Sequence, residues 1–352
     1  MRTSRVNGPG YFVASRRLWC EDQLMLKLKL LRIFVCGAVL CSLGVAQPHK
    51  IGDPYSSPKS KWIKVNTHIH TTVTGSSMTP CQAATAYAAA GYGAIILSDK
   101  TDRLGTGPVT ADPGAACDTV GTNRVNVIPG YEDTQGNHFT VANVALIDLS
   151  ASIAGRQQAV NYAISNPATR RGAVFLAYAH PIYIPWTAAQ IESMTGVDAF
   201  EIWNGQGFDS TTLYDSVLAS GKRLWLHAAD DSYGVGGVNT GWDVVNADSN
   251  GTADVIDALK NGRFYATRNG QALRCAADKQ SVSCSVYNSE SDMSPWFAVF
   301  HWIGPDGKVL RQTSNVSTDR YTVVGNEGYV RLVATNSYGY YQVWSQPFYI
   351  AH

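Results

Sequence analysis

The chain has few charged residues and almost no excess of either sign. Its 352 residues include 28 lysines and arginines and 27 aspartates and glutamates, and charged residues make up only 16% of the total. A balance of this kind does not predict the basic surface that attracts nucleic acid, and no acidic tail is present. We therefore expect no nucleic-acid partner.

A stable membrane span is also not predicted. The apolar run Ile33–Ala46 is shorter than the roughly 20 residues of a transmembrane helix, and it follows basic residues in positions 27–32. Basic residues, a short apolar run and small residues before Gln47 are typical of an export signal. We predict a signal in 1–46, with Met25 as an alternative start, and a secreted protein, either periplasmic or extracellular. An uncleaved membrane anchor is the alternative.

Cysteine is scarce after this segment. Of seven cysteines in the chain, four follow the predicted signal: Cys81, Cys117, Cys275 and Cys284. An even number in an oxidising compartment predicts two disulfides. Cys275 and Cys284 lie in a predicted hairpin and would form one pair, which leaves Cys81 and Cys117 for the other. Four separate buried thiols are the alternative.

Short apolar runs alternate with helix-like segments through the first two thirds of the chain. The runs that read as buried strands are 93–98, 125–130, 173–179, 199–203 and 223–228, and the helix-like segments are 80–91, 154–167, 187–196 and 210–221. Such alternation predicts an α/β barrel or a doubly wound sheet. From 274 onward, short alternating strands separated by turns predict a small antiparallel β-domain. We expect a linker over 47–60, an α/β domain over 61–273 and a β-domain over 274–352.

Polar side chains suited to metal binding follow the predicted strands. His68 and His70 are two residues apart, so they point to the same side of an extended chain. Further candidates at the strand ends are Asp99, Lys100, Glu132, His138, His180, Glu201, Asn204, Asp230 and Asp231. Because reactive groups collect at the carboxyl ends of strands in α/β barrels, we expect these residues to form one site.

The order of these motifs resembles a known family. The chain reads H-I-H, D-K, P-G-Y-E, H, A-H-P, E-I-W-N-G and D-D-S-Y, and as a set this resembles the PHP (polymerase and histidinol phosphatase) metallohydrolases. The branch most similar contains carbaryl hydrolase-like enzymes, in which a β-domain follows the catalytic domain. The likeness covers about 61–350. It implies a distorted (β/α)7 barrel with a metal cluster at the carboxyl ends of its strands.

The resemblance also implies a ligand set. His68, His70, Glu132 and Asp231 would hold a first ion, and Glu132 would bridge to a second ion bound by His138. Two imidazoles and two carboxylates suit zinc, manganese or iron. We predict one tight divalent ion and a second, weak one. Behind the ligands we expect four orienting residues: Asp99, Glu201, Asn204 and Asp230.

Two positions depart from the family pattern. Lys100 stands where the family has the histidine of an Asp-His pair, and Tyr233 stands where an imidazole is expected for a third site that would include His180. A charged Lys100 beside a dication would be repelled, so we expect a lowered pKa or an orientation away from the site. Lys100 would then act as a base, as a carboxylated bridging ligand or as a stabiliser of substrate charge, and Tyr233 as a donor to the substrate or leaving group.

These features predict a secreted metal-dependent hydrolase acting on a small-molecule ester. Metal-bound hydroxide would attack a phosphoester or a carboxyl or carbamate ester, with His180 stabilising the developing charge and Asp231 accepting a proton. The alternative is a catalytically degenerate PHP-fold protein that serves as an extracellular binding or self-assembling structural module.

Overall fold

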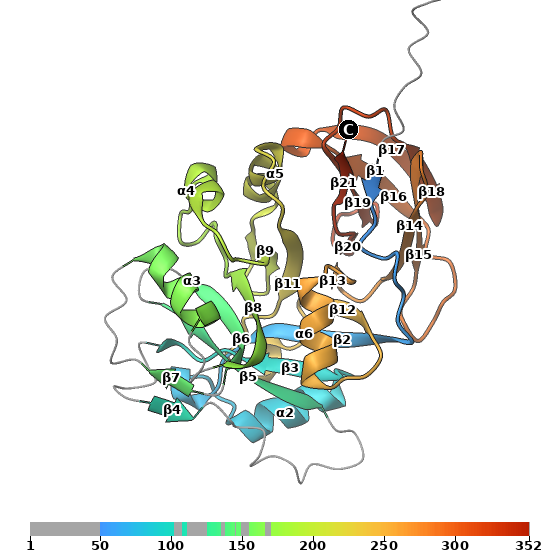
Figure 1. The fold of residues 1–352 in the computed structure, drawn as a ribbon. Helices are drawn as coiled ribbons and strands as arrows, with labels where there is room; N and C mark the ends of the chain where they lie inside the picture. Colours follow the sequence, from blue (N-terminus) through green and yellow to red (C-terminus); the bar gives the residue numbers. More distant parts are fainter. Residues whose placement is uncertain are drawn as a thin grey trace, which may run out of the picture. The chain divides into compact units, whose positions relative to one another are not determined.

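A computed structural model describes residues 50–101, 108–110, 125–134, 138–144, 146–148, 155–165 and 170–351 (Figure 1). The α/β part contains the following strands: β2 (Lys61–Ile69), β3 (Ala94–Leu97), β4 (Pro108–Thr110), β5 (Asn126–Asp133), β6 (Phe139–Val144), β7 (Leu146–Asp148), β8 (Arg170–Tyr178), β9 (Ala199–Asn204), β10 (Phe208–Asp209), β11 (Trp225–Ala229), β12 (Trp242–Ala247) and β13 (Phe264–Arg268). The protein is therefore a sheet-rich mixed α/β structure.

Five short helices lie between these strands: α2 (Pro80–Ala89), α3 (Arg156–Ser165), α4 (Ala188–Ser193), α5 (Thr211–Ala219) and α6 (Thr252–Lys260). Each of the four helix-like segments of the sequence forms a helix. Thr79 and Thr187 begin α2 and α4 with reciprocal capping boxes, in which the threonine hydroxyl accepts from the third helical N–H and a glutamine reaches back. These caps satisfy N–H groups that would otherwise lack partners.

The strands pair as two parallel groups joined by an antiparallel strand. β2, β3 and β5 are parallel, and so are β8, β9 and β11. β6 lies between β5 and β8 and is antiparallel to both. A closed (β/α)7 barrel is not confirmed, because among the described strands no ladder joins β11 to β12 or β2. Within the described part of the chain, a backbone bridge between Ile69 and Ser232 lies at that gap.

The C-terminal part is antiparallel, as predicted. Its strands are β14 (Ala272–Ala277), β15 (Ser281–Tyr287), β16 (Ala298–Ile303), β17 (Val309–Val316), β18 (Thr318–Thr322), β19 (Tyr329–Thr335), β20 (Gln342–Trp344) and β21 (Phe348–Ala351). β20 pairs with β13, so the large sheet continues from the α/β part into this part. The predicted linker contributes a strand of its own, β1 (Lys50–Gly52), which pairs with β21.

A buried ion pair also links the two parts. Arg331 of β19 donates through Nε and Nη2 to the two carboxylate oxygens of Asp215 in α5, at 2.9 and 2.6 Å. Tyr329 donates to the same carboxylate. Both charged groups are almost fully buried. Removing one partner would leave an uncompensated buried charge, so this contact fixes α5 against the C-terminal strands.

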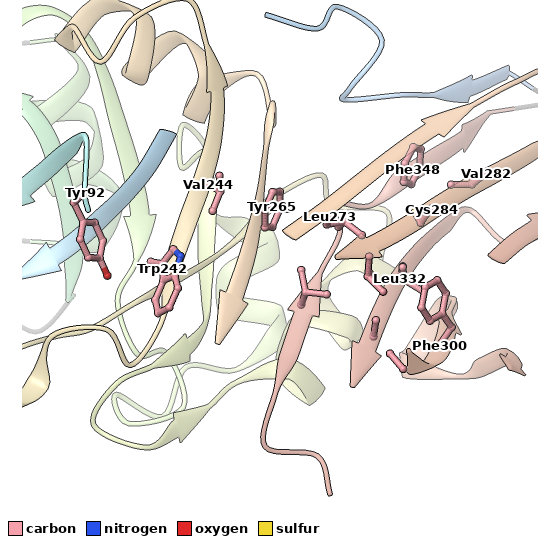
Figure 2. Close-up of a cluster of buried hydrophobic side chains, with 14 of the residues drawn as sticks. Tyr92, Trp242, Val244, Tyr265, Leu273, Val282, Cys284, Phe300, Leu332 and Phe348 are labelled. Carbon is pink, nitrogen blue, oxygen red and sulfur yellow. The ribbon is translucent and has the colours of Figure 1, made fainter. Parts of the chain in front are cut away.

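A continuous apolar core runs beneath the large sheet into the C-terminal strands. Figure 2 shows part of it, from Tyr92 and Trp242 at one end to Phe300 and Phe348 at the other. Cys284 belongs to this core and is bonded to Cys275, as predicted for the hairpin of β14 and β15. Cys81 is also disulfide-bonded. Cys117, its predicted partner, lies outside the described residues.

The predicted export signal also lies outside the described part of the chain. Among the described residues, no helix combines the length and the apolar composition needed to cross a membrane.

Candidate metal centre

Successive strand ends bring the predicted ligands together. His68 is the second-to-last residue of strand β2 and His70 directly follows that strand, while Glu132 is near the end of β5. His180 and Asp231 each follow their strand by two residues, after β8 and β11. All of these side chains are buried. The structure therefore brings these predicted residues together at the carboxyl ends of the strands.

Four donor atoms meet without any hydrogen-bond partner. These atoms, called here the first donor group, are His68 Nε2, His70 Nε2, Glu132 Oε2 and Asp231 Oδ1. His68 Nε2 lies 3.6 Å from Glu132 Oε2 and 3.4 Å from Asp231 Oδ1. His70 Nε2 lies 3.4 and 2.9 Å from the same two oxygens. Buried polar atoms are rarely left unpaired, so four together call for an additional partner.

These separations fit a tetrahedral metal ion. Bonds of about 2.0–2.2 Å from a metal to nitrogen and oxygen give a tetrahedron with edges of about 3.3–3.6 Å. Three of the four measured separations lie in this range and the fourth is shorter, at 2.9 Å. Two imidazoles and two carboxylates are a donor set that suits a divalent transition metal. The residues present therefore fit the ion that the sequence predicts.

A second donor group shares the Glu132 carboxylate. It consists of Glu132 Oε1, His138 Nδ1 and His180 Nε2, with separations of 2.6 Å from the oxygen to His138 and 3.0 Å to His180. Each of the two histidine nitrogens hydrogen-bonds to the Glu132 oxygen. His180, which the sequence assigns to a third site, lies in this second group.

Three of the candidate ligands have left-handed backbone conformations. His138, His180 and Asp231 have φ angles of 46°, 28° and 47°. Such values are uncommon outside glycine and are found more often for Asn, Asp and His. Backbone strain of this kind tends to persist where the surrounding structure holds a functional side chain in place.

Glu201 orients a ligand of the first group, as predicted. Its Oε1 lies 3.1 Å from His68 Nδ1, which leaves Nε2 of that ring directed to the other donors. Its Oε2 accepts from the backbone N–H of His180 and from the amide of Asn204. Asn204 donates in addition to Asp231 Oδ2 at 3.1 Å. A histidine ligand held by a carboxylate through its other nitrogen is the usual arrangement around metals in proteins.

Asp99 and Asp230 hold loops instead of ligands. Asp99 accepts from the backbone and hydroxyl of Thr71 at 2.7 and 2.6 Å and from the hydroxyl of Thr74. Asp230 accepts from Tyr87 and from the backbone N–H groups of residues 239–241. Among the contacts of the described residues, neither carboxylate meets a side chain of the two donor groups, so their role behind the ligands stays a prediction.

Lys100 and Tyr233 do lie at the site. Lys100 Nζ is 3.8 Å from Glu132 Oε2, and it lies 5.5 Å from the centre of the Tyr233 ring. The Tyr233 ring packs against His70, with ring centres 4.4 Å apart. Burial acts to lower the pKa of Lys100, but Glu132, Tyr233 and Asp231 outweigh it and raise the pKa. The predicted lowering assumed a neighbouring dication, and the protein groups alone act in the opposite direction.

The buried carboxylates favour a positive charge at the centre of the cluster. Burial acts to lower the pKa of His68, but Asp231, Glu201 and Glu132 outweigh it and hold the pKa well above its ordinary value. Burial likewise acts to raise the pKa of Glu132, yet His138, His180 and His68 hold it well below the ordinary range. A cation at the first donor group would supply this positive charge.

The aromatic residues near the site differ in exposure. Tyr183 is 59% exposed and its ring lies 5.4 Å from that of His180. Trp186 is buried against Phe139 and Tyr178, and Trp203 is half-buried under Arg268. Of these three aromatic residues, Tyr183 is the one that is exposed enough to contact a ligand.

Sequence reasoning missed a buried polar layer behind the first donor group. His227 and Asp243 are fully buried, with His227 Nδ1 at 3.1 Å from the Thr67 hydroxyl and 3.9 Å from an Asp243 oxygen. His227 pairs in register with Glu201 on the neighbouring strand. The signal available was a single polar residue inside each of two apolar strand runs.

Comparisons with known proteins find structural likenesses, including two distant ones. No protein-family model matches the chain. No curated protein matches it either. A two-domain protein of Bacteroides vulgatus ATCC 8482, described as containing a predicted PHP-like metal-dependent phosphoesterase, is similar with a TM-score of 0.47 at 15% identity, over 83% of this chain and 95% of that one. The lesion-specific endonuclease PfuEndoQ of Pyrococcus furiosus is similar with a TM-score of 0.34 at 14% identity, over 57% and 56%.

Proposed function

We propose that this chain is a metal-dependent hydrolase of ester bonds, of the PHP type and related to its carbaryl hydrolase-like branch. The observation that carries the proposal is the convergence of four buried, unpartnered donor atoms from His68, His70, Glu132 and Asp231. An ion bound by them would provide Lewis acidity and would lower the pKa of a coordinated water toward about 7.

The surrounding side chains supply positioning and charge. His180 and Lys100 approach Glu132 from its two oxygens, so both can donate to an oxygen atom that becomes negative during ester cleavage. The Asp231 carboxylate accepts from Asn204 through Oδ2 and keeps Oδ1 free for a ligand. Tyr233 places its hydroxyl beside Lys100, where it can donate to a substrate oxygen. Bond cleavage requires a proton on the leaving oxygen, which these groups are placed to provide.

The substrate we propose is a small ester, with a phosphoester favoured. Lys100 adds a cation at the edge of the site, which suits an anionic substrate better than a neutral one. We further propose that the protein is exported, with its mature chain beginning at Gln47, and that it does not act on nucleic acid.

The decisive experiment measures metal content and turnover in the same preparations. Purified protein should retain about one transition-metal ion per chain and should hydrolyse an activated phosphoester or aryl ester. His68→Ala, His70→Ala and Asp231→Asn should lose both properties. The control is His301→Ala, which removes a histidine of β16 that lies outside both donor groups. Full metal content in the three variants would contradict the proposal.

A second candidate function has one observation in its favour. The turn between β19 and β20 presents Tyr338, Tyr340 and Tyr341, which are 80%, 65% and 44% exposed. Exposed tyrosines on a turn held by the Asn336 side chain suit an extracellular binding or self-associating module. This function predicts no turnover across a broad panel of esters, together with self-association or glycan binding that survives removal of metal.

A further inference from the structure

Two aromatic side chains lie together at the edge of the second donor group. The rings of Tyr183 and Phe208 are 5.0 Å apart, and both lie near the His180 ring, at 5.4 and 6.2 Å. Tyr183 and Phe208 are called the aromatic platform below. Tyr183 is 59% exposed. An exposed tyrosine that packs on a second ring presents a stable apolar surface to solvent, and such surfaces commonly serve in binding.

The backbone holds the platform in place. Tyr183 N–H donates to the His180 carbonyl at 2.9 Å, which closes a tight turn after β8. Phe208 pairs across a hairpin with Asn204, and Gly207 has a φ of 95° that this turn requires. The two loops are joined because Ile182 N–H donates to the Ser210 hydroxyl at 3.3 Å. The two rings are therefore positioned before any ligand arrives.

The platform and Lys100 lie on different sides of one carboxylate. Lys100 approaches Glu132 Oε2. His180, whose ring lies near both rings of the platform, approaches Glu132 Oε1. A substrate bound at the donor groups would meet a cation at one end and an aromatic surface at the other. The two ends of the site would therefore favour different halves of an ester, an anionic half near the cation and an aromatic half near the platform.

We propose that Tyr183 and Phe208 determine specificity by binding a planar aromatic leaving group, while the anionic half of the ester faces Lys100. The inference rests on the proposed function for the position of the reacting bond. It assigns the substrate to the class of aryl esters with an acidic acyl or phosphoryl half. Alkyl esters of the same acids would lack the contact with the platform.

The test compares two non-hydrolysable anions, phenylphosphonate and methylphosphonate, by calorimetric titration of the metal-loaded protein. The phenyl compound should bind about tenfold more tightly, the upper range of a single aromatic contact. Tyr183→Ala and Phe208→Leu should reduce this preference severalfold without changing the affinity for methylphosphonate, and Tyr183→Phe should retain it. Phe297→Ala, which removes an exposed ring of the C-terminal part, is the control.

The outcomes separate this inference from the proposed hydrolysis. An equal preference in wild type and Tyr183→Ala, no preference in wild type, or no binding of either anion overturns the platform. A phenyl preference lost in Tyr183→Ala supports it, even when no ester is turned over, and in that case the hydrolase proposal alone fails. Ester hydrolysis with an unchanged phenyl preference in Tyr183→Ala leaves the hydrolase standing and overturns the platform.

Discussion

The two oxygens of Glu132 face donor groups of different character. Oε2 faces the first donor group, in which none of the four atoms has a hydrogen-bond partner. Oε1 faces the second donor group and accepts from His138 and His180 at 2.6 and 3.0 Å. The same carboxylate thus belongs to one set of unpaired atoms and to one set of paired atoms.

This difference determines how strongly each group should attract a cation. An unpaired buried polar atom costs about 1–3 kcal/mol, so an ion at the first group gains its ligands and removes that cost. An ion at the second group must first break the hydrogen bonds that His138 and His180 make to Glu132 Oε1. We therefore expect tight binding at the first group and weak binding at the second.

The largest loss of metal binding and hydrolysis should follow from changing Glu132, whose carboxylate both donor groups share. Glu132→Gln keeps the size of the side chain but loses its charge and one acceptor oxygen. We expect loss of all tightly bound metal and of hydrolysis, well beyond the roughly 10–100-fold effects of residues behind the ligands. Elemental analysis after desalting measures this. A Glu132→Gln protein that retains one ion per chain would show that the two groups do not depend on the shared carboxylate.

The next largest effect should be a gain of tight metal binding at the second donor group. Lys100→His replaces the ammonium that lies 3.8 Å from Glu132 Oε2 with a neutral ligand beside the carboxylate that both donor groups share. The metal content should rise from about one to about two ions per chain, and activity on phosphoesters should rise with it. If Lys100 instead stabilises charge on the substrate, the second ion should bind while activity on the native substrate falls. An unchanged metal content and activity would place Lys100 outside the site.

A smaller effect is expected from the polar layer behind the first donor group. Burial lowers the pKa of His227 to about 4, whereas its unfolded value is about 6.5. Between these values the unfolded chain binds a proton that the folded protein does not, so stability falls as the pH falls through this window. This single group should cost about 3 kcal/mol by pH 4.

The variant that tests this is His227→Gln. Its unfolding free energy should depend less on pH than that of wild type between pH 7 and pH 4, as measured by urea denaturation at several pH values. Parallel curves for the two proteins would mean that His227 is protonated in the fold.

The smallest effect is expected from changing Glu201, the residue that orients a ligand of the first donor group. Glu201→Gln keeps a hydrogen-bond acceptor for His68 Nδ1 but removes the negative charge behind the ring. Metal affinity should fall about 10–100-fold while the amount of metal bound at saturation stays the same. A competition titration with a chelator measures the affinity. No change in affinity would mean that the charge of Glu201 does not act through His68.

The ligand positions were predictable because chemistry and strand ends coincide in the sequence. His68 and His70 alternate along a strand, and Glu132 and Asp231 each follow an apolar run. Their meeting point follows from parallel strands that end at one edge. Glu201 was a candidate for the same reason, since it lies in the predicted strand 199–203, shortly before the strand ends.

Other features depend on contacts that no local pattern records. Asp99 and Asp230 have the residue type of ligand-orienting groups, but their direction is set by the loops that donate to them. β1 has only three residues, too few for a periodic signal. The antiparallel strand β6 interrupts the regular alternation, because it folds back on β5 after a short connection and then pairs with β8.

The pairing of β1 with β21 has a consequence for how the protein is made. Lys50 lies opposite Ala351, and Gly52 lies opposite Tyr349, so this ladder joins segments separated by almost the whole described chain (Figure 1). Closing a loop of that length is slow in comparison with local contacts. During synthesis, β1 emerges before all the strands that lie between it and β21, and its β21 partner follows only after them. The β1 segment must therefore stay without this partner until β21 has been made, so this edge of the sheet forms after the intervening strands are available to pair.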